Sequence, residues 1–210
     1  MQLLIDGVPS APLPSEVADV ITAVATVSDE LRGHGRTIVS VSVDGFDVWP
    51  EHLRGPIGTK SLGEVTTIMV VSRPIRALVE ECLGDLGLAA PDLPQICRDL
   101  ATVFQSDQPS DGFEPFHRLA EIWGHMKSQE MLCLSALALK PEELSIDGVS
   151  FVRHTEELNQ FLREAAQALE KNDLVLLGDL LEYELAPRAE TEPKILALLQ
   201  QHAGSLASAQ

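Results

Sequence analysis

The residues with the clearest capacity for chemistry are two histidines and a glutamate at four-residue spacing, His117, Glu121 and His125. On a helix, side chains four residues apart lie above one another, so these three groups could converge on one metal ion. The spacing lacks the HExxH order of the zinc proteases. A polar stripe facing solvent or an interface explains the row more simply, so a metal-dependent enzyme or regulator is the alternative function and not the favoured one.

Other catalytic patterns are missing from the sequence. The segment from Gly55 to Ser61 contains glycine, lysine and serine, but it lacks the GxxxxGK[ST] spacing, and Pro56 removes a backbone N–H that a phosphate would need. No serine stands in a GxSxG elbow. We therefore predict a non-enzymatic protein with no catalytic residue, no cofactor and no metal.

The net charge and the cysteines indicate which partners and which cellular compartment to expect. The chain has 15 basic and 32 acidic residues, a net charge of −17, which repels nucleic acid and anionic membrane surfaces. Its three cysteines show no CxxC spacing and fall on apolar stripes, as small buried side chains do. The sequence has no membrane-spanning stretch and no basic start of a signal peptide. We expect a cytoplasmic protein.

The first third of the chain changes hydrophobic period several times. We predict a strand at Gln2–Ile5 with a weak return strand, a helix from an N-cap at Ser15 to Gly33, and two later strands, Thr37–Val43 and Glu64–Ser72. This order resembles the β-grasp (ubiquitin-like) fold over roughly the first 73 residues. A ferredoxin-like arrangement is the competitor, but it needs a second helix where the sequence indicates a loop.

Two aromatic residues stand beside a turn in this region, Phe46 and Trp49, the latter followed by a proline. Aromatic side chains next to a turn either close the edge of a core or anchor a partner. We favour the core edge and keep Trp49 as a candidate interaction residue. Binding of a small ligand by this part of the chain is a further possibility without residue-level support.

From residue 75 onward the apolar spacing is that of helices. Residues 75–210 hold 10 basic and 23 acidic residues, a net charge of −13. Apolar stripes predict helices over residues 75–86, 93–104, 116–126, 158–169, 174–185 and 195–206, with Thr155 as an N-cap and Pro187 as a stop. Short connections imply antiparallel neighbours. The fold class predicted is α+β, a small β-grasp-like domain at 1–73 followed by an antiparallel helical bundle at 74–210.

The tail from Gln167 to Glu184 has a helix, a short polar turn at Lys171-Asn172-Asp173, and a second helix. This segment is similar to the tail of small bacterial helical proteins, including flagellar-type export chaperones, and the whole chain looks like an uncharacterised bacterial family. The chaperone resemblance implies a cytoplasmic adaptor that binds another protein, with a possible link to flagellar or secretion systems.

Consecutive apolar residues in the tail indicate where such a partner would bind. Leu174, Val175, Leu176 and Leu177 follow one another, and a single helix face cannot bury all four. We predict that these residues, with Leu181, contact a protein partner or a second copy of the chain, most simply in a dimer. Nucleic acid and membrane are not expected as partners.

Overall fold

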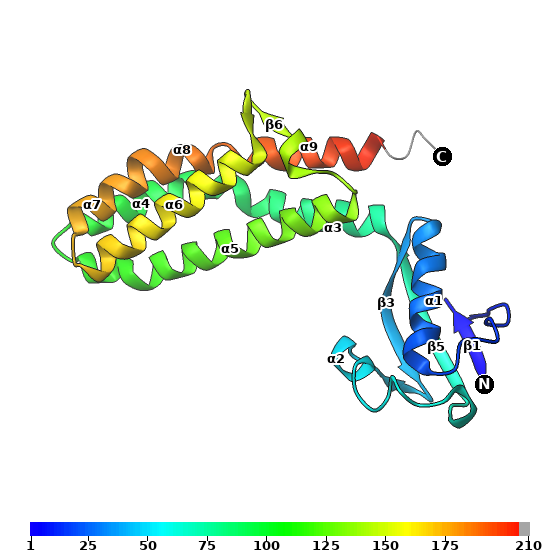
Figure 1. The fold of residues 1–210 in the computed structure, drawn as a ribbon. Helices are drawn as coiled ribbons and strands as arrows, with labels where there is room; N and C mark the ends of the chain where they lie inside the picture. The colour runs from blue at the N-terminus through cyan, green and yellow to red at the C-terminus, as the bar shows by residue number, and fades with distance from the viewer. Residues whose placement is uncertain (206–210) are drawn as a thin grey trace. The chain divides into compact units, whose positions relative to one another are not determined.

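The computed structural model describes residues 1–205, and the predicted contribution of Leu206 to the last helix lies outside them. The chain divides into two compact units, Met1–Leu78 and Val79–Gln210. The boundary falls inside helix α3 (Ile75–Ala89). Strands and helices occur in the order in which the sequence predicts them, so the α+β class is confirmed (Figure 1).

The N-terminal unit is built on a five-stranded mixed sheet with the order β2-β1-β5-β3-β4. Central strand β5 (Thr67–Pro74) runs parallel to β1 (Gln2–Ile5) and antiparallel to β3 (Arg36–Val43). Two short edge strands, β2 (Val8–Pro9) and β4 (Phe46–Asp47), close the sheet as hairpins. Pro9 of β2 thus lies at an edge, where a missing N–H is tolerated.

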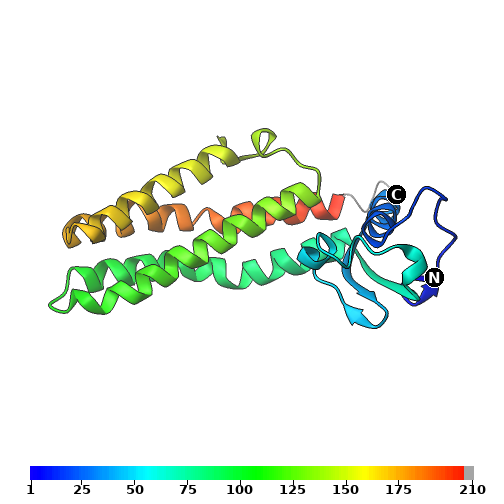
Figure 2. The same cartoon turned by 60° about the horizontal axis from the view of Figure 1, so that its bottom comes forward.

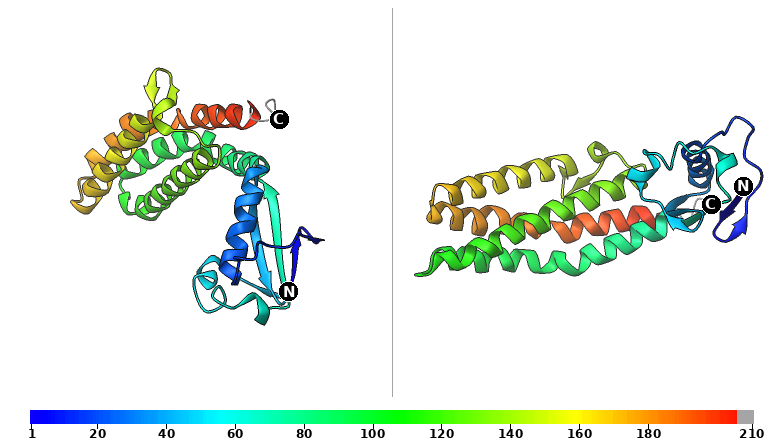
Figure 3. Two further views of the ribbon diagram at one scale, coloured as in Figure 1. Left: turned by 45° about the vertical axis from the view of Figure 1, so that its right-hand side comes forward. Right: turned by 90° about the horizontal axis from the view of Figure 1, so that it is seen from below.

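Helix α1 (Val20–Gly33) covers one face of this sheet (Figure 3). Its buried side chains recur at three- and four-residue steps, and they pack against the inward-facing residues of β1, β3 and β5. The core of the unit consists of Leu3, Val20, Ala23, Val24, Val27, Leu31, Val41, Val43, Val48, Val65, Ile68 and Val70. All of these residues lie in the first 70 positions, so the unit has a core of its own.

An Asp-Gly pair forms the turn of each hairpin in the sheet. Asp6-Gly7 and Asp44-Gly45 have positive φ at both positions, the geometry of a tight turn that matches strand twist. Asp6 also accepts hydrogen bonds from the backbone N–H and the hydroxyl of Ser72 on β5, at 2.7 and 2.8 Å. Arg36 donates to the same carboxylate at 2.9 Å. This polar contact joins β1, β3 and β5.

Two details of the N-terminal unit differ from expectation. The N-cap of α1 is Asp19, whose carboxylate accepts from the N–H of Thr22 at 2.9 Å, and not Ser15. Asp19 suits the position because its side chain satisfies one of the free N–H groups of the first turn. The loop after β4 contains a short helix, α2 (Pro50–Leu53), and the 3-10 turn η1 (Leu62–Glu64).

The helical unit consists of long helices joined by short turns (Figure 2). Its elements after α3 are η2 (Ala90–Asp92), α4 (Leu93–Phe104), η3 (Pro109–Gly112), α5 (Phe113–Ala136), η4 (Pro141–Glu143), β6 (Ser145–Ile146), β7 (Val149–Ser150), α6 (Phe151–Glu170), α7 (Leu174–Asp179), η5 (Leu180–Leu185), α8 (Ala186–Ala189) and α9 (Glu192–Ser205). The run α7–η5–α8 packs against α4 on one side and α6 on the other, and α9 contacts α5 and η2.

The turn between α6 and α7 has the structure that the sequence predicts. Asn172 follows the end of α6 with φ of 56°, a left-handed conformation that asparagine tolerates at a helix end. Asp173 then caps α7, because its carboxylate accepts from the N–H of Leu176 at 3.1 Å. The two helices are therefore antiparallel neighbours.

Helix α6 begins earlier than predicted. Ser150, and not Thr155, is its N-cap, with the hydroxyl accepting from the N–H of Arg153 at 3.2 Å. Ser150 also belongs to the β6–β7 hairpin, whose Asp147-Gly148 turn has positive φ at both residues. The last residue of the hairpin is thus the residue that caps α6, and Phe151, the first residue of that helix, is buried.

Pro187 does not stop the tail helix, contrary to the sequence prediction. Residues Leu180–Leu185 form a π-helical turn, in which the N–H of Ala186 bonds to the carbonyl of Leu181, five residues back. Pro187 then stands in the first turn of α8, where its missing N–H costs little. The wider turn allows the chain to continue in one direction through a proline.

Candidate functional site

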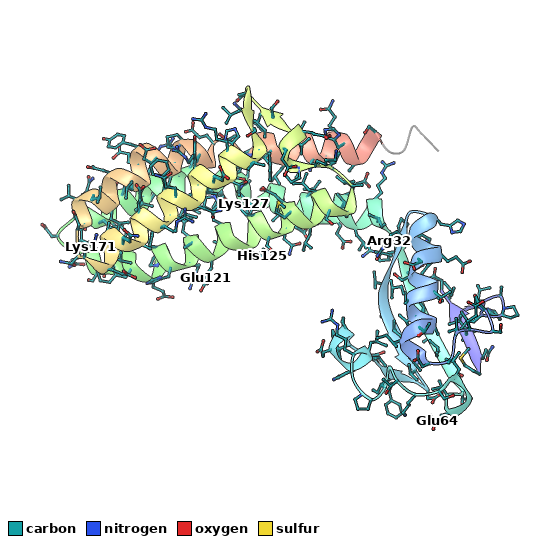
Figure 4. The ribbon with its side chains drawn as sticks, in the orientation of Figure 1. Arg32, Glu64, Glu121, His125, Lys127 and Lys171 are labelled. Carbon is teal, nitrogen blue, oxygen red and sulfur yellow. The ribbon has the colours of Figure 1, made fainter. Side chains whose placement is uncertain are left out.

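The His117, Glu121 and His125 row lies on the solvent-facing side of α5, and all three side chains are exposed. Figure 4 shows Glu121 and His125 pointing away from the neighbouring helices. Within residues 1–205, no group of three or more histidine, cysteine, aspartate or glutamate side chains is placed to hold a metal ion. The row is a solvated stripe in this structure, and no other element among residues 1–205 brings a further ligand to it.

The opposite side of α5 holds a buried group of charged side chains. The Lys127 ammonium lies 3.0 Å from Oε2 of Glu130 and 2.6 Å from Oε2 of Glu192, the first residue of α9. All three residues are buried, and Glu130 is fully so. The ring of Phe151, at the start of α6, lies 5.9 Å from the ammonium. One lysine thus joins the middle of α5 to the first turns of two other helices.

The charge of this group has a direct consequence for its protonation. Two ionised carboxylates and one ammonium would leave a net negative charge in the core, which is costly without further donors. Oε1 of Glu130 has no hydrogen-bond partner within the described residues. Burial is the main cause that raises the pKa of Glu130 to about 8, and Lys127 opposes this while Glu192 adds to it. A proton on Glu130 makes the group electrically neutral.

Cys97 and Cys133 are buried, as the sequence indicates, whereas Cys82 is half-buried and its thiol donates a hydrogen bond to Oε1 of Gln129 at 3.4 Å. Burial raises the pKa of the Cys97 thiol to about 12. It also raises the pKa of Cys133 to about 12, with smaller contributions from Cys82 and Glu130. A thiol with a raised pKa is a poor nucleophile, so we assign no catalytic role to Cys97 and Cys133.

The predicted interaction residues of the tail separate into two groups. Leu177 and Leu181 are fully buried in the bundle itself, so their assignment to an interface is wrong. Val175 and Leu176 have exposed fractions of 69% and 46%, and Leu174 is half-buried. Tyr183, which is not among the predicted interaction residues, has an exposed fraction of 63%. The accessible part of the predicted site is therefore the outer face of the helix.

The π turn explains why one row of residues stays buried and another stays exposed along the whole run α7–η5–α8. Leu177, Leu181, Leu185 and Ala189 are buried at successive four-residue steps, while Val175, Asp179, Tyr183 and Pro187 are exposed at the same steps. In a regular helix of 3.6 residues per turn, each such step rotates forward, and three steps would move a row off its face. A turn with i→i+5 bonding is wider and offsets this rotation. We call Val175, Leu176, Asp179, Tyr183 and Pro187 the α7 face.

Ion pairs connect the C-terminal end of the run α7–η5–α8 to both neighbouring helices. Toward α6, Arg188 pairs with Glu184 at 2.8 Å and Glu157 at 3.2 Å, and its guanidinium lies 4.1 Å from the ring centre of Phe161. Toward α4, Arg98 pairs with Glu190. These contacts fix the end of the run α7–η5–α8 between its neighbours.

Trp49 belongs to the N-terminal unit, as the residue before α2. Its exposed fraction is 64% and that of Phe46 is 75%. The expectation that these aromatics close a core edge is therefore wrong. The core beneath β4 is closed by Val48 instead, which is buried and bonds through its N–H to Val41. Trp49 remains available to a partner.

One surface depression of about 380 Å³ lies between the β6–β7 turn and α9. Its ionisable residues, Asp147 and Lys194, form an ion pair with each other. Because they neutralise one another and no further titratable group lines the depression, it offers no set of convergent groups for catalysis.

The structure therefore defines an α+β protein whose accessible candidate site is an apolar helix face and whose buried charges lie in a core. Residues 90–191, just under half of the chain, match DUF8042, described as a domain of unknown function. The matched segment runs from η2 to the end of α8 and includes the α7 face. Neither the curated proteins nor the solved structures contain a significant match. Among the described residues, no helix is long and apolar enough to cross a membrane.

The sequence did contain a signal for the buried charges. Trp123, Lys127, Glu130 and Leu134 are spaced four, three and four residues apart, so the two charged residues stand on the apolar face of α5. A charged residue at such a position must be neutralised or paired. The partner Glu192 had no comparable signal, because its burial depends on how α9 packs.

Proposed function

We propose that this protein is a non-enzymatic, cytoplasmic protein-binding module, adaptor-like or chaperone-like, that holds a protein partner on the α7 face. The observation that carries the proposal is the exposure of Val175, Leu176 and Tyr183 on one ordered helix. Burying a side chain of this size contributes roughly 1.5–3 kcal/mol. Three of them can anchor a partner, although part of that energy offsets the cost of association.

Further features support the same proposal. Local π turns recur at functional positions in helices, and here the π turn keeps Val175 and Tyr183 on one face. A link to flagellar or secretion systems rests on the resemblance of the segment from Gln167 to Glu184 to export-chaperone tails. The cytoplasmic location rests on the unpaired cysteines, Cys82, Cys97 and Cys133, which are free thiols.

The proposal is tested by comparing two double variants of the full chain. Val175→Ser with Tyr183→Ser removes two apolar side chains from the α7 face. Met131→Ser with Leu132→Ser removes two from α5, where their exposed fractions are 45% and 59%. We expect affinity capture from the source cell, quantified by mass spectrometry, to lose its partner with the first variant and to keep it with the second. Equal capture by both variants would contradict the proposal.

Self-association is measured on the same variants by sedimentation velocity. A concentration-dependent dimer of the wild-type chain that becomes a monomer in the Val175→Ser, Tyr183→Ser variant would show that the partner is a second copy. A monomer in all variants leaves the α7 face to a different protein.

A further inference from the structure

Acidic side chains surround the apolar residues of the α7 face. Between residues 170 and 191, six carboxylates accompany two basic side chains. The carboxylates are those of Glu170, Asp173, Asp179, Glu182, Glu184 and Glu190, and the basic residues are Lys171 and Arg188. The local field is therefore negative, in line with the net charge of −13 for residues 75–210.

Several of these carboxylates already have partners. Asp173 caps the N-terminus of α7, Glu184 pairs with Arg188, and Glu190 pairs with Arg98. Asp179 and Glu182, by contrast, make no hydrogen bond or ion pair within residues 1–205. Asp179 lies on the α7 face one helical turn before Tyr183, and Glu182, the residue before Tyr183, is half-buried at the edge of that face. The α7 face thus presents apolar side chains with one carboxylate that is free to accept a cation, and a second such carboxylate borders it.

A second copy of this chain fits such a surface poorly. Two α7 faces brought together would oppose the same carboxylates, and like charges in contact oppose association by an amount that salt reduces. Nucleic acid is repelled for the same reason. A partner with basic groups beside apolar ones complements both features.

The arrangement of the face also indicates the shape of the partner. Val175 to Pro187 spans twelve steps along one helical run, about 18 Å at 1.5 Å per residue. A second helix of about three turns, lying alongside, would present apolar residues at three- and four-residue spacing over the same length. We infer that the α7 face binds a basic amphipathic helix, with an apolar stripe flanked by lysine or arginine, and this inference rests on the proposed protein-binding function.

Three synthetic peptides test the inference. The first is an 18-residue amphipathic helix of leucine and lysine, the second replaces every lysine by glutamate, and the third scrambles the first so that no apolar stripe remains. Each carries a fluorescent label and is titrated with the full-length protein at low salt, with anisotropy as the readout. We expect binding of the first peptide alone, and weaker binding as salt is added.

Two sets of variants assign the binding to the α7 face. Asp179→Asn with Glu182→Gln removes the free carboxylates without changing side-chain size, and we expect roughly 3- to 10-fold weaker binding of the leucine-lysine peptide. Val175→Ser with Tyr183→Ser should weaken it by roughly 10-fold or more. Met131→Ser with Leu132→Ser should match the wild-type chain. Because five of the six residues are exposed and Glu182 is half-buried, unchanged circular dichroism is the check of folding.

The outcomes separate this inference from the proposed function. Equal binding of all three peptides, or unchanged binding after Asp179→Asn with Glu182→Gln, would overturn the basic helix as ligand. If cellular capture depends on Val175 and Tyr183 while the two carboxylates have no effect, the protein-binding function stands and the inference falls. Dimerisation through the α7 face would likewise replace the basic helix by a second copy. If the Val175→Ser, Tyr183→Ser variant keeps both peptide binding and cellular capture, the inference and the proposed function are both contradicted.

Discussion

Glu130 shows how one buried residue determines the response of the helical unit to pH. Its pKa is raised from an ordinary value of 4.5 to about 8, so the folded chain binds a proton that the unfolded chain has already released. The resulting stability is fully present below pH 4.5 and is lost as the pH rises through about 8. Lys127, Glu192 and the Cys133 thiol are the titratable groups that interact with it.

Replacing Glu130 by glutamine keeps the volume of the side chain and makes it permanently neutral. We expect the free energy of unfolding of Glu130→Gln to rise relative to that of the wild-type chain between pH 5 and 8, by up to about 1.4 kcal/mol for each pH unit. Urea titrations at a series of pH values measure this difference. A difference that is constant with pH would mean that Glu130 is ionised in the folded protein.

Asp6→Asn is a control of opposite sign. Hydrogen bonds from Ser72, and with smaller effect Arg36, lower the pKa of Asp6 below its ordinary value of 3.8. The stability from this group is therefore present above pH 3.8 and is lost as the pH falls through its lower folded value. We expect Asp6→Asn to destabilise the N-terminal unit at pH 7 and to approach the wild-type stability in acid.

Gly58 has a steric role in the loop that superficially resembles a phosphate-binding loop. A Cβ at this position would lie 1.8 Å from the carbonyl oxygen of Leu53. We expect Gly58→Ala to lower the free energy of unfolding by about 2 kcal/mol or more, because backbone must move. Gly33→Ala, where a Cβ would meet nothing within 4 Å, should be neutral or stabilising by up to about 1 kcal/mol. Thermal unfolding of the two variants compares them directly.

At the scale of elements, local patterns predicted most of the fold. Asp6-Gly7 and Asp44-Gly45 form hairpin turns, and Lys171-Asn172-Asp173 forms the predicted turn between α6 and α7, because turn and cap preferences act over a few residues. Asp111-Gly112 has the same letters but lies in the 3-10 turn η3. Local preference could not distinguish an Asp-Gly pair in a hairpin turn from one in a 3-10 turn, because the outcome depends on which apolar segments follow the pair.

The π turn could not be predicted from local preference, although its cause is visible in the sequence. Pro187 predicts a helix stop, because proline in a helix interior removes a hydrogen bond and clashes with the preceding turn. The leucines before it follow one another at four-residue steps. In a straight helix such a row rotates away from the buried face, so a straight helix could not bury all of them. Burial of Leu181, Leu185 and Ala189 together favours a wider turn over a break, and that preference arises only from packing against α4 and α6.

Deleting one residue from the π turn tests this explanation. Removal of Glu182 would restore 3.6 residues per turn and would place Pro187 in the interior of a regular helix, at a cost of about 3 kcal/mol. Adding Pro187→Ala to the deletion should recover stability to within about 1 kcal/mol of the Pro187→Ala variant alone. Chemical denaturation of the four proteins gives the coupling energy, and zero coupling would show that the turn does not exist to accommodate the proline.

At the scale of the whole molecule, the buried residues rather than the exposed ones were predictable. Apolar periodicity located the cores of both units, because burial of apolar area is the common driving force for every element. The same reasoning could not identify which of the four consecutive residues Leu174–Leu177 would remain exposed to solvent. That choice depends on the rotation of α7 between α4 and α6, which no property of the residues themselves decides.

The self-contained core of the N-terminal unit leads to a prediction about folding. Every member of that core lies between Leu3 and Val70, so we expect a fragment of residues 1–78 to fold alone and to unfold cooperatively. Ile68 is fully buried at the centre of the sheet, and Ile68→Ala should cost about 2–5 kcal/mol. If the unit is independent, this loss will be the same in the fragment and in the matching transition of the full chain, as followed by circular dichroism. A larger loss in the full chain would show that residues beyond 78 stabilise the sheet.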